Sequence, residues 1–391
     1  MIYLRKKKGF RVSDRQEKIA GWARQMGVSD ESLQGFLQEA VAAESSVGET
    51  SDVEREEALL EAERLKELGT IEEQQSRYGE ALKCYEAALE IFRAHADRAG
   101  EGKVLGNLGL VYKAQEQYEL AIAYHTQALT IAREIGDKRI EGSHLGNLGI
   151  VYHAQGKYEL AIGHFTRSIA IVRDLGMKRT EGSQLGNLGL VYQAQGQYDQ
   201  AIAHYKESIT IARDIGDKRI EGSQLGNLGY VYQAQGQYGQ AVEYCTQSIA
   251  IARDLGIKLT EGIQLGNLGD ALFALERYDE AESAFRQAIS IGNQTLLAVA
   301  GAFSASLALL LAKQGKLDEA QALLEAGEPQ VETRPEEYAK FLCKKGQVCH
   351  MAGDAQGVRA ALVQAQAVAT ELKVLDDSEV GLAVAKLAEL L

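Results

Sequence analysis

Five asparagines stand at regular intervals along the 391-residue chain, and their amide groups are candidates for binding a ligand. They recur 40 residues apart, each within the motif LGNLG: Asn107, Asn147, Asn187, Asn227 and Asn267. An amide both donates and accepts hydrogen bonds, so a row of amides suits the backbone of an extended or helical peptide. A second interpretation stays open, in which the amides bond to adjacent repeats and only fix their stacking.

Two other positions of the repeat vary from copy to copy and are candidates for specificity. The first row is Leu110, Ile150, Leu190, Tyr230 and Asp270, and the second is Lys113, His153, Gln193, Gln233 and Phe273. Both rows are mostly neutral and partly apolar, with a distinct character at the Tyr230–Phe273 end. They predict a partner segment with spaced hydrophobic anchors. Neutral divergence of duplicated copies is the alternative explanation.

Other chemistry finds no support in the sequence. Phosphate-binding loops, dinucleotide fingerprints, zinc-protease motifs and nucleophile elbows are absent, so we expect neither an enzyme nor a cofactor. Cys343, Cys349 and His350 supply only three candidate metal ligands, and a helix would point the last two about 100° apart. We expect buried thiols and no metal site.

Composition restricts the classes of partner and the cellular compartment that we expect for this protein. The net charge of −13 argues against binding to nucleic acid or to an anionic membrane. We find no apolar stretch of 18 residues, no signal-peptide pattern at the N-terminus and no disulfide framework among the four cysteines. These features lead us to expect a cytoplasmic protein with protein or peptide partners.

The 40-residue unit reads as two helices. Leu185, Leu188 and Tyr192 recur at helical spacing, and a second stripe follows the turn AQGQY. We expect Gly196 to break the two helices, and Gly216 with Asp217 to end one unit and cap the next, with Glu221 in the new first turn.

Glycines inside the first helix require an explanation, because each costs about 1 kcal/mol relative to alanine. We expect close packing to offset this cost, with Gly189 allowing the second helix to approach through Ala201. We also expect Ser183, Gly186, Asn187, Leu190, Gln193 and Ala194 to face a groove, where the small Gly186 and Ala194 admit a peptide.

These residues carry a resemblance to a known family. The tetratricopeptide repeat (TPR) signature is matched in its spacing by Leu185, Leu188, Gly189, Tyr192, Ala201, Tyr205 and Ser208. The chain resembles the longer-unit variety found in Pins-type adaptors, kinesin light chains and bacterial TPR regulators. It departs from the usual unit of about 34 residues, and Arg213 stands near the place of the common proline. The resemblance implies an all-α, right-handed superhelical solenoid of antiparallel helix pairs with a concave peptide-binding face.

One TPR ligand site is incomplete here. Lys103, Asn107 and Asn147 resemble the start of the carboxylate clamp of co-chaperone TPR domains. The next unit, however, places Ser183 and Asn187 where that clamp requires further basic residues. The sequence therefore argues against this clamp.

Three regions are expected. Residues 1–52 comprise a basic tail, a helical hairpin at 14–43 and an acidic linker. Residues 53–330 form the TPR array, with units near 61–100, 101–140, 141–180, 181–220, 221–260, 261–295 and 296–330. Residues 331–391 form a degenerate TPR and a C-terminal capping helix. The hairpin resembles a helix-turn-helix, but its second helix lacks lysine and arginine, which favours docking or capping over DNA binding.

The sequence therefore predicts a non-catalytic scaffold or adaptor that binds a peptide segment of a partner in the TPR groove. The alternative is a ligand-responsive bacterial signalling or transcriptional regulator, whose N-terminal hairpin relays binding to DNA or to an effector. Fluorescence of Trp22, the only tryptophan, would respond to groove ligands in the regulator and stay unchanged in the scaffold. Self-association through the solenoid ends is a third possibility, which gel filtration would test.

Overall fold

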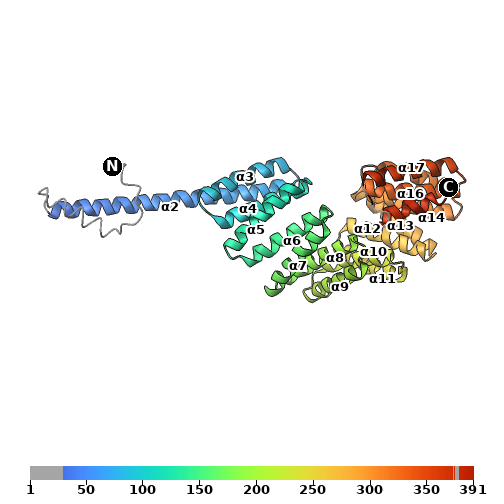
Figure 1. Ribbon diagram of the computed structural model, residues 1–391, viewed down its shortest axis with the longest axis horizontal. Helices are drawn as coiled ribbons and strands as arrows, with labels where there is room; N and C mark the ends of the chain where they lie inside the picture. Colours follow the sequence, from blue (N-terminus) through green and yellow to red (C-terminus); the bar gives the residue numbers. More distant parts are fainter. Residues whose placement is uncertain (1–29, 373, 375–377) are drawn as a thin grey trace. The chain divides into compact units, whose positions relative to one another are not determined.

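The computed structural model describes residues 30–372, 374 and 378–391, and this part of the chain is all-α. It contains seventeen helices and no strand (Figure 1). Consecutive helices pack as pairs joined by short turns, which confirms the predicted repeat array. The chain divides into two compact units, residues 1–135 and 136–391, which are described separately below.

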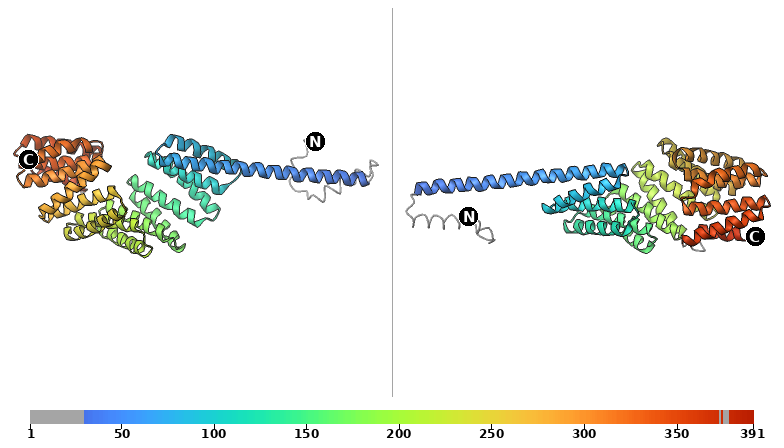
Figure 2. Two further views of the ribbon diagram at one scale, coloured as in Figure 1. Left: turned by 180° about the vertical axis from the view of Figure 1, so that it is seen from behind. Right: turned by 90° about the horizontal axis from the view of Figure 1, so that it is seen from above.

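The first unit contains two helix pairs, and the first helix of the first pair is unexpectedly long. Its helices are α2 (Asp30–Gln74), α3 (Tyr78–Ala94), α4 (Arg98–Ala114) and α5 (Tyr118–Glu134). The N-terminal part of α2 extends beyond α3 and α4 (Figure 2). The acidic segment 45–57, expected as a linker, lies inside this helix. It is rich in glutamate and contains no proline, so nothing in it stops a helix. The first part of the expected hairpin lies outside the described residues.

The second unit continues the pairs and ends in a short helix. Its helices are α6 (Lys138–Ala154), α7 (Tyr158–Asp174), α8 (Lys178–Ala194), α9 (Tyr198–Asp214), α10 (Lys218–Ala234), α11 (Tyr238–Asp254), α12 (Lys258–Ala274), α13 (Tyr278–Thr295), α14 (Leu297–Lys313), α15 (Leu317–Val331), α16 (Pro335–Met351), α17 (Ala355–Glu371) and α18 (Glu379–Ala388). The last helix packs against α16 and α17, with Leu387 fully buried beside Gly346.

The turn within each pair is a local structure that the sequence determines. Gly196 ends α8 with a φ of 70°, in the left-handed region that favours glycine. The Gln197 N–H donates to the Tyr192 carbonyl, and the Gly196 N–H donates to the Gln193 carbonyl. These two bonds form a Schellman motif, which satisfies the last carbonyls of the helix.

The junction between pairs is held by a capping aspartate and a buried glutamate. The Asp217 side chain accepts from the backbone N–H groups of Arg219 and Ile220, both at 3.1 Å, as predicted. Glu221 is only 5% exposed, and its two oxygens accept from Arg213 Nε at 2.7 Å and Lys218 Nζ at 2.8 Å. The glutamate therefore links the end of α9 to the start of α10. Equivalent double pairings occur at Glu101, Glu181 and Glu261.

Close packing explains Gly189, as expected, and the atoms nearest to an added Cβ belong to the ring of Tyr205. A Cβ at position 189 would lie 2.6 Å from Tyr205 Cε1. Equivalent glycines in other units have equivalent neighbours: Gly149 faces Phe165, Gly229 faces Cys245 and Gly269 faces Phe285. In the unit of Gly229 the carbonyl of Ala241, the counterpart of Ala201, also lies 3.5 Å from such a Cβ. The side chain from the second helix thus fills a space that is free only because the first helix has glycine there.

Candidate binding site

The repeated asparagines lie half-buried on the first helix of successive pairs. Asn107 belongs to the first unit, and the other four belong to the second. Two of them bond within their own helix: Asn227 Nδ2 donates to Gln224 Oε1 at 3.0 Å, and Asn267 Nδ2 donates to Gln264 Oε1 at 3.5 Å. Each of these two amides therefore has one local partner and keeps further hydrogen-bonding capacity.

The glutamines that accept these bonds pack against the preceding repeat. Gln224 covers Gly186, where an added Cβ would lie 2.5 Å from the glutamine Nε2. The pairs Gln184 with Gly146 and Gln264 with Gly226 repeat the arrangement. The expectation that Gly186 admits a peptide is therefore wrong, because the neighbouring repeat already fills that space. Asn227 and Asn267 donate to glutamines of their own helix that pack against the preceding repeat, whereas the stacking interpretation expects direct bonds from the asparagines to adjacent repeats.

The two variable rows differ in their surroundings. Leu110 is 37% exposed in the first unit, while Ile150, Leu190, Tyr230 and Asp270 are half-buried in the second. The second row is partly engaged within its own pairs. Gln193 accepts from the Tyr205 hydroxyl at 2.8 Å, and the His153 ring lies 6.0 Å from that of Tyr158. The Phe273 ring lies 5.9 Å from the Tyr278 ring, and Lys313 Nζ of α14 lies 4.8 Å from the Phe273 ring.

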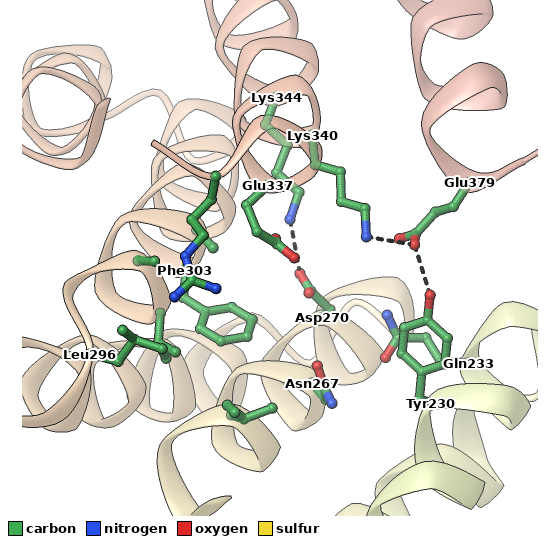
Figure 3. Close-up of a pocket in the computed structure, with 15 residues that line it drawn as sticks. Tyr230, Gln233, Asn267, Asp270, Leu296, Phe303, Glu337, Lys340, Lys344 and Glu379 are labelled. Carbon is green, nitrogen blue, oxygen red and sulfur yellow. Dashed lines mark hydrogen bonds and ion pairs between the residues drawn. The ribbon is translucent and has the colours of Figure 1, made fainter. Parts of the chain in front are cut away.

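A cavity of about 370 Å³ in the second unit brings several of these residues together with others that the sequence did not indicate. Its walls come from five helices, α10, α12, α14, α16 and α18, together with Leu296 and Arg334, which directly precede α14 and α16 (Figure 3). The residues predicted from the repeat that line it are Tyr230, Gln233, Asn267 and Asp270. Phe273 and the other predicted residues are not among its walls.

One wall of the cavity is apolar. It is built by Leu296, Val299 and Phe303, with Ile263 and two alanines, Ala298 and Ala302. Phe303 packs over Gly266, so it takes the place that a glutamine occupies over Gly146, Gly186 and Gly226. The repeat pattern did not indicate this wall because it decays after residue 290. The run of alanine, leucine and valine in α14 was the available signal.

The opposite wall carries charged side chains, and four of them form two ion pairs. Lys340 Nζ lies 2.8 Å from Glu379 Oε2, which also accepts from the Tyr230 hydroxyl at 2.7 Å, and Lys344 Nζ lies 3.7 Å from Asp270 Oδ1 (Figure 3). Burial raises the pKa of the Glu379 carboxyl, but the charge and hydrogen bond of Lys340 and the hydrogen bond from Tyr230 together outweigh burial, so the net shift of this pKa is downward. Burial also raises the pKa of the Tyr230 hydroxyl. This wall can therefore offer hydrogen bonds while its charges largely cancel.

The cysteines do not join this cavity. Cys343 and Cys349 pack in an apolar cluster with Val358 and Leu387, and burial raises the pKa of the Cys343 thiol to about 11. Among the described residues, no group of three or more histidine, cysteine or acidic side chains could hold a metal ion. None of the described helices combines the length and apolar character needed to span a membrane.

Comparisons with known proteins agree with this architecture. A family model described as a tetratricopeptide repeat matches residues 59–134, 101–174, 140–214, 180–254 and 222–294, and a second model with that description matches residues 267–335. A search of curated protein sequences finds no match.

Solved structures give similarities of fold. The apo form of the quorum sensor NprR from B. thuringiensis has a TM-score of 0.61 and 18% identity, over 91% of this chain and 99% of that chain. Aspartyl phosphate phosphatase F from Bacillus subtilis has a TM-score of 0.58 and 16% identity, over 84% and 85%. A tetratricopeptide repeat protein from Parabacteroides merdae has a TM-score of 0.52 and 17% identity, over 74% and 98%.

Proposed function

Because the chain belongs to the tetratricopeptide repeat family, we propose that it is a non-catalytic interaction scaffold that binds a peptide segment of a partner protein. The binding site is the cavity lined by α10, α12, α14, α16 and α18, which we call the groove. The quorum sensor that is similar in fold is consistent with a role in signalling.

The composition of the groove supports this proposal. An apolar wall formed by Leu296, Val299 and Phe303 faces the amides of Asn267 and Gln233. A peptide offers the same combination, since its side chains can be apolar while its backbone both donates and accepts hydrogen bonds. The volume of about 370 Å³ suits one or two bulky side chains rather than a folded domain.

A peptide-display selection on the full chain tests the proposal. Clones from a random dodecapeptide library that bind the wild type are titrated against two variants of α14. Ala302→Arg fills the groove, whereas Leu297→Arg adds the same charge to a side chain that is 54% exposed and lies outside the groove. We expect Ala302→Arg to weaken binding at least about tenfold, the effect of losing about 1.4 kcal/mol, and Leu297→Arg to have little effect.

Asn267→Ala should weaken the same clones by a smaller factor, because it removes one amide and leaves the apolar wall intact. Circular dichroism of each variant controls for folding. Equal binding of all clones to the wild type and to a folded Ala302→Arg variant would exclude the groove as the binding site.

One structural observation supports the alternative role as a regulator. Because α2 is continuous from Asp30 to Gln74 and packs on α3, residue 30 is connected to the first helix pair by a helix rather than by a flexible linker. A helix can transmit a displacement that a linker would absorb. Trp22 lies outside the described residues, and its fluorescence remains the measurement that separates the two roles.

A further inference from the structure

A carboxylate of the chain itself occupies one side of the groove. Glu379 is the first residue of α18, and its Oε2 accepts from the Tyr230 hydroxyl at 2.7 Å and lies 2.8 Å from Lys340 Nζ. The two partners come from helices far apart in the sequence, α10 and α16, and point at the carboxylate from different sides (Figure 3). Tyr230 and Lys340, whose Nζ also lies 3.2 Å from Glu336 Oε1, thus form a site that holds a carboxylate.

The tyrosine hydroxyl is a feature of this repeat. Residues Leu110, Ile150 and Leu190 occupy the same position in the preceding units, and none of them can donate a hydrogen bond. The carboxylate site also shares its cavity with the apolar wall of Leu296 and Phe303. A ligand in the groove can therefore contact both.

Glu379 can exchange with a ligand at this site. Its side chain is 57% exposed, so water can solvate the carboxylate once it is displaced, whereas the Lys340 side chain is only 22% exposed and stays in the groove. The main packing of α18 lies elsewhere, at Val380 and Leu387, which are 3% and 0% exposed. Displacing the carboxylate therefore leaves the apolar contacts of the helix in place.

We propose that Tyr230 and Lys340 form a carboxylate subsite of the groove, which Glu379 occupies until an acidic residue of the bound peptide replaces it. This inference rests on the proposed function. It specifies the ligand as a peptide that carries an acidic residue close to a bulky apolar residue, the latter contacting Phe303. Glu379 then acts as a competitor that weakens binding of every such peptide.

The test is a dodecapeptide-display selection on the full-length Glu379→Ala variant, with the enriched peptides titrated against the wild type. We expect an enriched motif with aspartate or glutamate near a bulky apolar residue. We expect these peptides to bind Glu379→Ala at least about tenfold more tightly than the wild type, since a charge-assisted bond has to be exchanged. Glu389→Ala, which removes an exposed charge from the end of α18, should behave like the wild type.

Two further variants identify the subsite. Within the Glu379→Ala background, Lys340→Met and Tyr230→Phe should each weaken acidic peptides, but not versions of those peptides with glutamine in place of the acidic residue. Tyr230→Phe keeps the ring and loses only the hydroxyl, so it serves if Lys340→Met does not fold. Enriched peptides without an acidic residue, or binding independent of Lys340 and Tyr230, would overturn the subsite and leave the groove function standing.

A different failure would remove both proposals. If the peptides enriched on Glu379→Ala bind equally well to the groove-filling Glu379→Ala/Ala302→Arg variant, they do not occupy the groove at all.

If Glu379→Ala lowers the melting temperature and tightens no peptide, Glu379 only stabilises the contact between α18 and α10, and the competitor role is wrong.

Discussion

Replacing Gly189 with alanine should destabilise the protein, although alanine is the better helix former. Gly189 lies in the interior of α8, and an added Cβ would lie 2.6 Å from Tyr205 Cε1 and 2.8 Å from Tyr205 Cδ1. Tyr205 is 0% exposed, and its hydroxyl bonds to Gln193, so the ring has no free space to enter. The matched control is Gly163→Ala in the interior of α7, where nothing lies within 4 Å of the added carbon.

The sign of each change in unfolding free energy depends on whether the cost of overpacking exceeds the gain in helix propensity. Overpacking a dense core costs about 1–3 kcal/mol, while the higher helix propensity of alanine returns about 1 kcal/mol. A 2.6 Å contact with a fully buried ring belongs to the upper part of that range. We therefore expect Gly189→Ala to lose about 1–2 kcal/mol of unfolding free energy, and Gly163→Ala to gain about 0.5–1 kcal/mol.

Urea denaturation of the full chain, followed by circular dichroism, measures the difference. Repeat arrays can unfold in more than one step, so the comparison uses the midpoints of the two variants under identical conditions. A double variant, Gly189→Ala/Tyr205→Ala, should be no less stable than Tyr205→Ala alone, because the clashing ring is gone. A Gly189→Ala protein as stable as Gly163→Ala would refute the argument that the ring requires the glycine.

Two further predictions concern buried titratable groups. Glu221→Gln should cost about 1–3 kcal/mol near neutral pH, since the carboxylate bonds to Arg213 and Lys218. Burial raises the pKa of Glu221, but these two hydrogen bonds lower it to a net value below 4.5. The cost should therefore be fully present above pH 4.5 and disappear as the pH falls through the lowered pKa, which urea titrations at pH 7 and pH 3 check; equal stability of both proteins at pH 7 would contradict it. Burial lowers the pKa of His144 from 6.5 to about 4, so the wild type should lose stability as the pH falls between these values, by up to about 3 kcal/mol at about 1.4 kcal/mol per pKa unit. His144→Gln, which introduces the residue found at positions 184, 224 and 264, should remove that loss, and parallel pH profiles of the two proteins would show the reasoning to be wrong.

The elements of the fold were predictable because short-range forces fix them. Gly196 and Asp217 act on backbone groups within about five residues, so their types reveal a helix end wherever they occur. The 40-residue spacing then extends each local inference to every copy. The acidic segment 45–57 was mispredicted as a linker, since its charge suggested solvation while its helix-forming residues continue α2.

The partners of the glycines could not be read from the sequence. Gly189 faces Tyr205, and Gly186 faces Gln224, but the spacing alone allowed Ala201 or a bound peptide instead. Which side chain enters the space beside a glycine depends on the crossing of two helices and on the rotamers at their contact. Both of these are set by packing across the whole pair.

The sequence by itself determined that this protein is an array of helix pairs, where each pair begins and ends, and which residues recur on each helix. Only the tertiary structure decided where a groove exists. It brings Tyr230 next to Glu379, 149 residues later in the chain, and it places the apolar wall of α14 opposite the amides of Asn267 and Gln233. The physical reason is range: hydrogen bonds along a helix follow from neighbouring residues, whereas a cavity depends on side chains from several helices that the repeat pattern does not relate.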